Sequence, residues 1–308
     1  MKEYLSSIRP NGMIKEADFD FFENFQTEIY EKYGYHLDKL CPSSKFWFYD
    51  KLNDKINHYN RYTHNYYIEY AKRFEGKRES ALKVLEIGIY TGFSMLLWEK
   101  FFPNAQIYGI DINIQGVLFN NKNAYDLCKD KKRIHLFEFD GTNEKKINEF
   151  IKEVGGDFDI IIDDGSHYGD HQIKSLIHFL PHLKEDGIFV VEDIGLYPTG
   201  GKSYWINNDI NNYLEIGITD PDNPRSKEYN GIPMFEYFMK NYNNIPHNRL
   251  AKYKNYLSRE NINLLDKVEC NWIAPINFET INRNTTKDGE IDNFKTQGNS
   301  KMCFINYK

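Results

Sequence analysis

Two acidic pairs stand where predicted strands end, and their residue types and spacing could bind a metal ion. Asp163-Asp164 follows the apolar run Ile160–Ile162, and Glu192-Asp193 follows Val190-Val191. Short β-branched runs of this kind are typical of buried parallel strands. Residues 170–183 are predicted to form a helix, so the two strands should lie side by side in one βαβ unit. We therefore expect both acidic pairs at one edge of a sheet.

Carboxylates gathered at one point repel each other unless a cation joins them. Their hard oxygen ligands favour Mg²⁺, Mn²⁺ or Ca²⁺ over zinc. We predict Asp164, Glu192 and Asp193 as metal ligands, and His167, three residues after Asp164, as a catalytic base beside them. The alternative is that these acids only cap the helices that follow. Two acidic pairs on consecutive strands, one of them followed by Gly-Ser-His, favour the metal site.

His171 lies one helical turn beyond His167, and two interpretations of it stay open. It either contacts substrate or orients a ligand, or it is an ordinary histidine of the helix surface.

Strand and helix patterns alternate through the middle of the chain, which predicts an α/β fold. This alternation implies a doubly wound, Rossmann-like parallel sheet with helices on both faces, whose ligands bind outside the carboxyl ends of the strands. The predicted strands are 83–88, 106–111, 133–139, 158–163 and 187–192. The predicted helices are 93–102, 116–128, 143–153 and 170–183.

The rest of the chain is assigned around this sheet. Residues 1–78 show helical periodicity and are predicted as an N-terminal helical region, with 79–308 as the main domain. Residues 195–262 are predicted as an insertion after the fifth strand that covers a substrate. Two last strands, 268–275 and 302–307, are expected to close the sheet as an antiparallel hairpin, and the Asn/Thr/Asp-rich stretch 281–300 is expected to be an exposed loop.

A cofactor pattern follows the first strand. Glu86-x-Gly88-x-x-x-Gly92 leads into a helix, and glycines there let the backbone pass close to a ligand. The second strand ends in Asp111, which could bind the hydroxyls of a ribose, and the third ends in Asp140, which could accept from the amino group of adenine. Tyr90 would crowd a pyrophosphate, so the pattern suits S-adenosylmethionine better than a dinucleotide. The alternative is that Gly88 and Gly92 only permit close helix–strand packing.

Composition narrows the class of partner. The net charge is −6 and no basic stripe stands out, which argues against nucleic acid. Four cysteines without a CxxC pair suggest reduced thiols in the cytoplasm. The first residues lack the apolar core of a signal peptide, and no apolar run is long enough for a membrane span. We expect a cytoplasmic protein with no membrane or nucleic-acid partner, for which a homo-oligomer stays open.

With these residues placed, the chain resembles the metal-dependent sugar O-methyltransferases of the macrocin and mycinamicin type, which have the class I methyltransferase fold. The resemblance covers roughly residues 60–205. The matching segments are His64-x-Tyr66-x-x-x-Tyr70, 102–111, 161–167, His171-Gln172, 179–183, Asp186-Gly187 and 191–193.

The resemblance implies roles for individual residues. It implies that Asp164, Glu192 and Asp193 bind Mg²⁺ and that His167 is the general base. We add Asp163 to the donor-binding candidates Glu86, Gly88, Gly92, Asp111 and Asp140. Family members follow the Glu-Asp pair quickly with Thr-Ser-Tyr-Trp, whereas here Ile194 to Lys202 intervene before Ser203-Tyr204-Trp205. The acceptor-facing loop is therefore expected to differ.

These inferences predict an O-methyltransferase that uses S-adenosylmethionine and Mg²⁺ or Mn²⁺ to methylate a sugar hydroxyl. The expected acceptor is a nucleotide-linked sugar, such as a GDP-heptose for a bacterial capsule. One alternative is a glycosylated natural product as acceptor. Two alternatives of other classes are a nicotinamide-dependent sugar-modifying enzyme and a non-catalytic glycan-binding protein.

Overall fold

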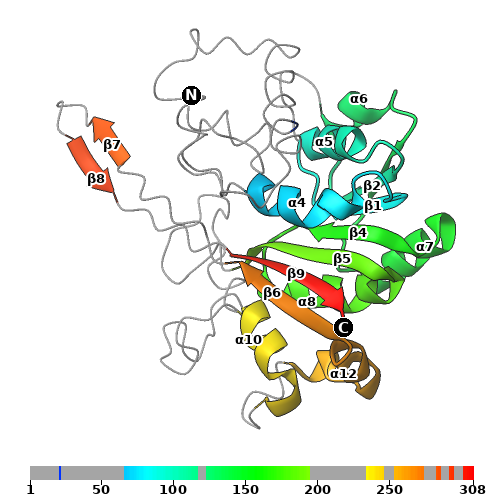
Figure 1. Ribbon diagram of the computed structural model, residues 1–308, viewed down its shortest axis with the longest axis vertical. Helices are drawn as coiled ribbons and strands as arrows, with labels where there is room; N and C mark the ends of the chain where they lie inside the picture. The colour runs from blue at the N-terminus through cyan, green and yellow to red at the C-terminus, as the bar shows by residue number, and fades with distance from the viewer. Residues whose placement is uncertain are drawn as a thin grey trace.

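In the computed structural model, buried parallel strands form the centre of a mixed sheet (Figure 1). The structure describes residue 21 and residues 66–116, 123–194, 234–245, 253–273, 282–285, 291–294 and 301–308. Seven strands pair in the order β3-β2-β1-β4-β5-β9-β6. Their bounds are β1 Lys83–Ile87, β2 Gln106–Asp111, β3 Ile134–Glu138, β4 Phe158–Asp163, β5 Leu183–Ile194, β6 Val268–Ile273 and β9 Lys301–Tyr307.

The first five strands are parallel, as the alternation of strand and helix patterns predicts. The last strand, β9, runs antiparallel between β5 and β6 and pairs with both. The predicted fold class, a Rossmann-like sheet with a C-terminal antiparallel pair, is confirmed. Because all the parallel strands point the same way, the ends of β1, β2, β4 and β5 form one edge, the carboxyl edge.

Helices cover both faces of the sheet (Figure 1). The α-helices are α4 Tyr67–Phe74, α5 Phe93–Phe101, α6 Ala124–Cys128, α7 Glu144–Val154, α8 Gly169–Phe179, α10 Met234–Asn241 and α12 Arg259–Leu265. Short 3-10 helices are η3 Glu75–Lys77, η4 Leu180–His182, η5 Tyr242–Asn244 and η7 Lys254–Tyr256.

Side-chain alternation along the strands builds two separate apolar layers. In β4, Ile160 and Ile162 pack with α4, α5 and α6, whereas Phe158 and Ile161 pack with α7, α8, α10 and α12. Because successive strand residues point to opposite faces, the apolar residues of β4 contribute to both layers. The α4 layer contains Tyr66 and Tyr70, which become important at the site.

Several predicted boundaries move. The helix predicted for 170–183 ends at Phe179. Strand β5 begins at Leu183, ahead of the predicted 187, and a register shift in its pairing with β4 accommodates the polar residues 184–186. The helix predicted from 116 begins at Ala124 in the described part of the chain.

The prediction that 281–300 is only a loop is wrong. Strands β7 Asn282–Thr285 and β8 Ile291–Phe294 pair antiparallel in a small separate sheet. The dipeptide Asp288-Gly289 between them is a common hairpin-turn signal that polar composition obscured.

Parts of the predicted organisation lie outside the described residues. They include most of the N-terminal region 1–78, much of the insertion 195–262, and residues 202–205. The boundary at 78/79 and the covering role of the insertion therefore stay predictions. Among the helices that are described, none is both long and apolar enough to cross a membrane.

Candidate functional site

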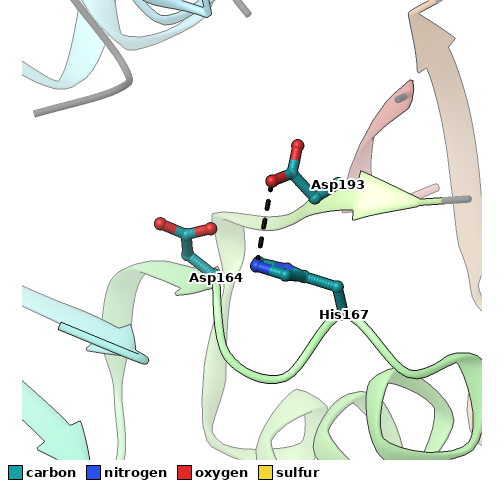
Figure 2. Close-up of side chains that lie close together, drawn as sticks. All are labelled: Asp164, His167 and Asp193. Carbon is teal, nitrogen blue, oxygen red and sulfur yellow. Dashed lines mark ion pairs between the residues drawn. The ribbon is translucent and has the colours of Figure 1, made fainter. Parts of the chain in front are cut away.

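The ends of β4 and β5 bring Asp164, His167 and Asp193 together. One potential ligand atom from each residue lies within 4.8 Å of the others. Figure 2 shows Asp164 and His167 on the loop after β4, with Asp193 facing them from the end of β5. Nε2 of His167 is 3.8 Å from Oδ2 of Asp193. Two carboxylates and an imidazole at this spacing could bind one divalent cation.

The backbone is unusual where these side chains are presented. His167 and Asp193 have φ angles of 61° and 53°, and Tyr90 after β1 has a φ of 46°. Left-handed values cost free energy for residues other than glycine, and such residues concentrate at functional sites. Asp193 also lies within a register shift between β5 and β9. This irregularity changes the direction of its side chain relative to a regular strand.

The shift explains how two adjacent carboxylates reach the same side of the sheet. In a regular strand, Glu192 and Asp193 would point to opposite faces. Here the Tyr66 hydroxyl donates to Oδ1 of Asp193 at 2.5 Å, and the Tyr70 hydroxyl donates to Oε1 of Glu192. Both tyrosines belong to the α4 layer. Burial raises the pKa of Tyr70 well above its usual value, and the nearby Glu192 charge raises it further, so the phenol stays a donor.

Glu192 is therefore placed differently from the other predicted ligands. Its side chain is fully buried against Tyr70, and it is not one of the three residues whose potential ligand atoms cluster. Glu86, also fully buried, accepts a hydrogen bond from Nε1 of Trp98 at 3.2 Å. The charges of Asp164 and Glu86 make further contributions to the raised pKa of Tyr70.

The glycines of the predicted donor loop have a packing role. Gly88 has a φ of 84°, and a Cβ there would lie 2.2 Å from the backbone oxygen of Asp164. Gly92 has a φ of 82°, and a Cβ there would lie 2.9 Å from the Cα of Ala124. Gly88 thus lets the end of β1 lie directly against the loop that carries Asp164 and His167.

Asp111 holds this donor loop through backbone amides. Its Oδ2 accepts from the amides of Ile89 and Tyr90 at 3.0 and 2.9 Å, and its Oδ1 accepts from the amide of Asn113 at 3.0 Å. The next residue, Ile112, is 73% exposed at the carboxyl edge. The sequence analysis did not single out Ile112, whose exposed apolar side chain stands directly after the acid that ends β2.

The remaining predicted donor residues are at neighbouring strand ends. Asp140 accepts from the amide and the hydroxyl of Thr142. Asp163 is buried, and burial raises its pKa to about 6 although the amide of Gly165 donates to its Oδ1. Both stand at the strand ends that the sequence implies.

His171, in the first turn of α8, hydrogen-bonds to the loop that carries Asp164 and His167. Its Nδ1 is 2.7 Å from Oγ of Ser166. Burial lowers the pKa of His171, which favours the neutral imidazole. This contact links the start of α8 to the residue before His167, and it is compatible with both interpretations of His171.

Comparisons with known proteins identify the central part of the chain. Residues 85–194, which contain β1 to β5 and the three clustered residues, match the family model of a methyltransferase domain. The mycinamicin VI 2''-O-methyltransferase of Micromonospora griseorubida is 32% identical over 140 residues, covering 43% of this chain and 32% of that protein. The L-olivosyl-oleandolide 3-O-methyltransferase of Streptomyces antibioticus is 29% identical over 131 residues, covering 40% of this chain and 31% of that protein.

The matches thus span about a third of the length of these curated relatives. A solved structure of the methyltransferase MycE from the mycinamycin pathway, in complex with Mg, SAH and mycinamycin VI, aligns with a TM-score of 0.46 and 19% identity. That alignment covers 86% of this chain and 53% of MycE. The predicted resemblance is confirmed: residues 85–194 match a methyltransferase domain, and the chain is similar to sugar O-methyltransferases over this central part.

Proposed function

We propose that this chain, built around a methyltransferase domain, transfers a methyl group from S-adenosylmethionine to a sugar hydroxyl with the help of a divalent cation. One observation carries the proposal. Asp164, His167 and Asp193 gather within 4.8 Å at the carboxyl edge of the sheet. Ligands of doubly wound sheets bind at this edge.

The chemistry of the clustered side chains fits a divalent cation. Asp164 and Asp193 offer oxygen ligands, and the buried carboxyl group of Glu192 precedes Asp193 in β5. A cation held there, Mg²⁺ or Mn²⁺, would supply Lewis acidity toward the oxygens of the acceptor. His167 is proposed as the base that removes the proton of the acceptor hydroxyl at Nε2, the atom that faces Asp193.

The residues predicted to bind the donor leave few free hydrogen-bonding positions for a nucleoside. A carboxylate has about four accepting positions, and three hydrogen bonds from backbone amides already reach Asp111. We propose that Asp111 binds one ribose hydroxyl while it holds the Ile89–Tyr90 turn in place. Exposed Ile112 would pack against the adenine, and Asp140 would accept from its amino group. Bound S-adenosylmethionine would supply the methyl group.

The acceptor is proposed from the relatives. Two of them are named for the transfer of a methyl group to mycinamicin VI and to L-olivosyl-oleandolide, and a third is named for an α-L-rhamnosyl tetracenomycin C. These names favour a glycosylated natural product, the alternative considered from the sequence, as the acceptor class. They give no support to a nucleotide-linked capsular sugar. The cytoplasmic location and any homo-oligomer stay predictions.

A turnover assay tests the proposal. The full chain would be incubated with S-adenosylmethionine and two acceptor panels, glycosylated natural products and nucleotide sugars, and methylated products would be detected by mass spectrometry. We expect a mass gain of one methyl group in the first panel, loss of turnover with EDTA and recovery with Mg²⁺ or Mn²⁺. Undiminished turnover without metal would exclude the cation.

A binding experiment separates the other classes of function. Calorimetry should show that the protein binds S-adenosylmethionine and does not bind NADP. Binding of NADP alone would favour the nicotinamide-dependent enzyme. A glycan that binds without turnover, in a protein that does not bind S-adenosylmethionine, would favour the non-catalytic alternative.

A further inference from the structure

Tyr66, just before α4, and Tyr70, within α4, face the two acids at the end of β5. Tyr66 is 5% exposed and Tyr70 is completely buried. The amide of Tyr70 donates to the carbonyl of Tyr66 at 2.9 Å, so the pair spans the first turn of α4. Residues four apart lie on the same side of a helix. One surface of α4 therefore presents two phenol hydroxyls toward the sheet.

The aromatic surroundings of Tyr70 restrict where its hydroxyl can go. Its ring centroid lies 4.9 Å from that of Phe74, 5.2 Å from Trp98 and 6.1 Å from Phe304. A ring packed on several sides in a close-packed interior has little freedom to change rotamer. The hydroxyl that donates to Glu192 is therefore held in place by the core.

The acidic pair is held from several directions. Tyr70 binds the side chain of Glu192, and Nε2 of Gln172 in α8 donates to the Glu192 carbonyl at 2.9 Å. Tyr66 binds Oδ1 of Asp193, whereas Oδ2 of Asp193 is the oxygen 3.8 Å from Nε2 of His167. The two oxygens of Asp193 are thus divided, one toward α4 and one toward the clustered residues.

We propose that Tyr66 and Tyr70 are positioning residues for the cation site. They orient Asp193 and Glu192 from behind, so that Oδ2 of Asp193 points toward the position that Asp164 and His167 share. The inference rests on the proposed function, because it assumes that a cation binds there. It goes beyond that function because it assigns part of the site's geometry to α4, which lies outside the matched domain at 85–194.

A purely structural role would have other consequences. If the tyrosines only satisfied buried carboxylates, removing a hydroxyl would lower stability and leave the affinity for a cation unchanged. If they orient the ligands, the affinity should fall even in a well-folded variant. Hydrogen-bond partners of metal ligands typically change affinity on the order of 10–100-fold when they are removed.

The test measures Mn²⁺ binding by electron paramagnetic resonance in the full chain, without any acceptor. The variants are Tyr66→Phe, Tyr70→Phe and the double variant, each of which removes one hydroxyl per position and keeps the ring. The matched control is Tyr256→Phe, because Tyr256 is 8% exposed and its hydroxyl also donates to a carboxylate, that of Asp170 in the first turn of α8, which is not a proposed metal ligand. Thermal unfolding is recorded for every variant.

We expect dissociation constants for Mn²⁺ raised on the order of 10–100-fold in the Tyr66 and Tyr70 variants, with the control close to the parent. The Mn²⁺ spectrum should also change, since the ligand geometry changes. When turnover is measured, saturating metal should recover most of kcat in Tyr66→Phe. Tyr66→Phe keeps the proposal testable if the more deeply buried Tyr70→Phe does not fold.

The outcomes separate this inference from the proposed function. A parent protein that binds Mn²⁺ and Tyr→Phe variants that bind it equally well would overturn the positioning role alone. A parent that binds no Mn²⁺ would overturn both. Equal weakening in the Tyr256→Phe control would show a general effect of lost stability and would also overturn the positioning role.

Discussion

Strand β4 has acidic residues at each end, and the two ends hold them in different ways. Near its start, Asp159 is buried, and its Oδ2 accepts from the amides of Leu82 and Lys83 at 2.8 and 2.9 Å. Its Oδ1 is 2.7 Å from Nζ of Lys184. Just beyond the end of the strand, Asp164 instead gathers with His167 and a second carboxylate, Asp193.

The difference shows how one residue type serves two purposes in one strand. At the start, a lysine balances the charge of Asp159, and the carboxylate ties β1 and β5 to β4. At the end, Asp164 and Asp193 are brought toward each other without a lysine between them among the clustered residues, and the left-handed φ of Asp193 raises the free energy of the folded chain. Such a gathering of acids becomes favourable when a cation binds. We therefore expect chemistry at the carboxyl end of β4 and not at its start.

The largest effect should come from removing an acid at the carboxyl edge. Asp193→Asn keeps the size of the side chain, and asparagine tolerates the left-handed φ at this position. We expect turnover to fall on the order of 10³-fold, because loss of several kcal/mol of charge stabilisation raises the barrier by about one factor of ten per 1.4 kcal/mol. Steady-state kinetics with saturating Mg²⁺ measure this, and wild-type rates in Asp193→Asn would contradict the ligand role.

The proposed base should give the next largest effect. His167→Asn removes the imidazole while suiting the φ of 61°. We expect a rate loss on the order of 10²-fold with little change in the affinity for Mn²⁺. If Mn²⁺ affinity fell instead, His167 would be a metal ligand, and a loss of less than tenfold in rate would require another base.

A smaller effect is expected on donor binding. Asp111→Asn should weaken S-adenosylmethionine binding about 10–100-fold, because a charged hydrogen bond contributes roughly 1.5–3 kcal/mol. Calorimetry measures the affinity. Glu138→Gln is the matched control, since Glu138 pairs with Asp111 in the β2–β3 register and accepts a backbone amide, that of Ile114, at 3.0 Å. Equal weakening in both variants would point to loosening of the loops rather than a lost ribose contact.

The amino end of β4 should affect stability and leave chemistry unchanged. Asp159→Asn removes the charge that Lys184 pairs with, and we expect the free energy of unfolding to fall by about 1–3 kcal/mol. Chemical denaturation measures this free energy of unfolding. Turnover per folded molecule and the requirement for metal should match the parent. A large loss of kcat in Asp159→Asn would mean that the two ends of the strand are not independent.

Much of the fold could be predicted because its signals are local. The strand predicted at 158–163 has a short, β-branched apolar centre, Ile160–Ile162, and the described strand has the same limits as the predicted one. The end of each parallel strand is likewise visible in the sequence, so Asp111, Asp164 and Glu192 could be assigned to the carboxyl edge. Two acidic pairs then sufficed to predict where a site would lie, although the roles of these residues stay predictions.

Contacts between distant parts of the chain could not be predicted in this way. Tyr66 and Tyr70 were noticed only as part of a motif, because their partners Asp193 and Glu192 are 127 and 122 residues away. The position of β9 between β5 and β6 is also a long-range feature, because β9 pairs with β5, which is distant in the sequence.

The sequence by itself determined which residues stand at the strand ends and which chemistry they could perform, because period and residue type are properties of short segments. Only the tertiary structure decided where those side chains point. The register shift beside β9 and the left-handed φ of Asp193 bring adjacent acids to one side of the sheet, where α4 meets them. This irregularity in β5 depends on the whole packed sheet. The sequence of the strand alone predicts that the two side chains lie on opposite faces.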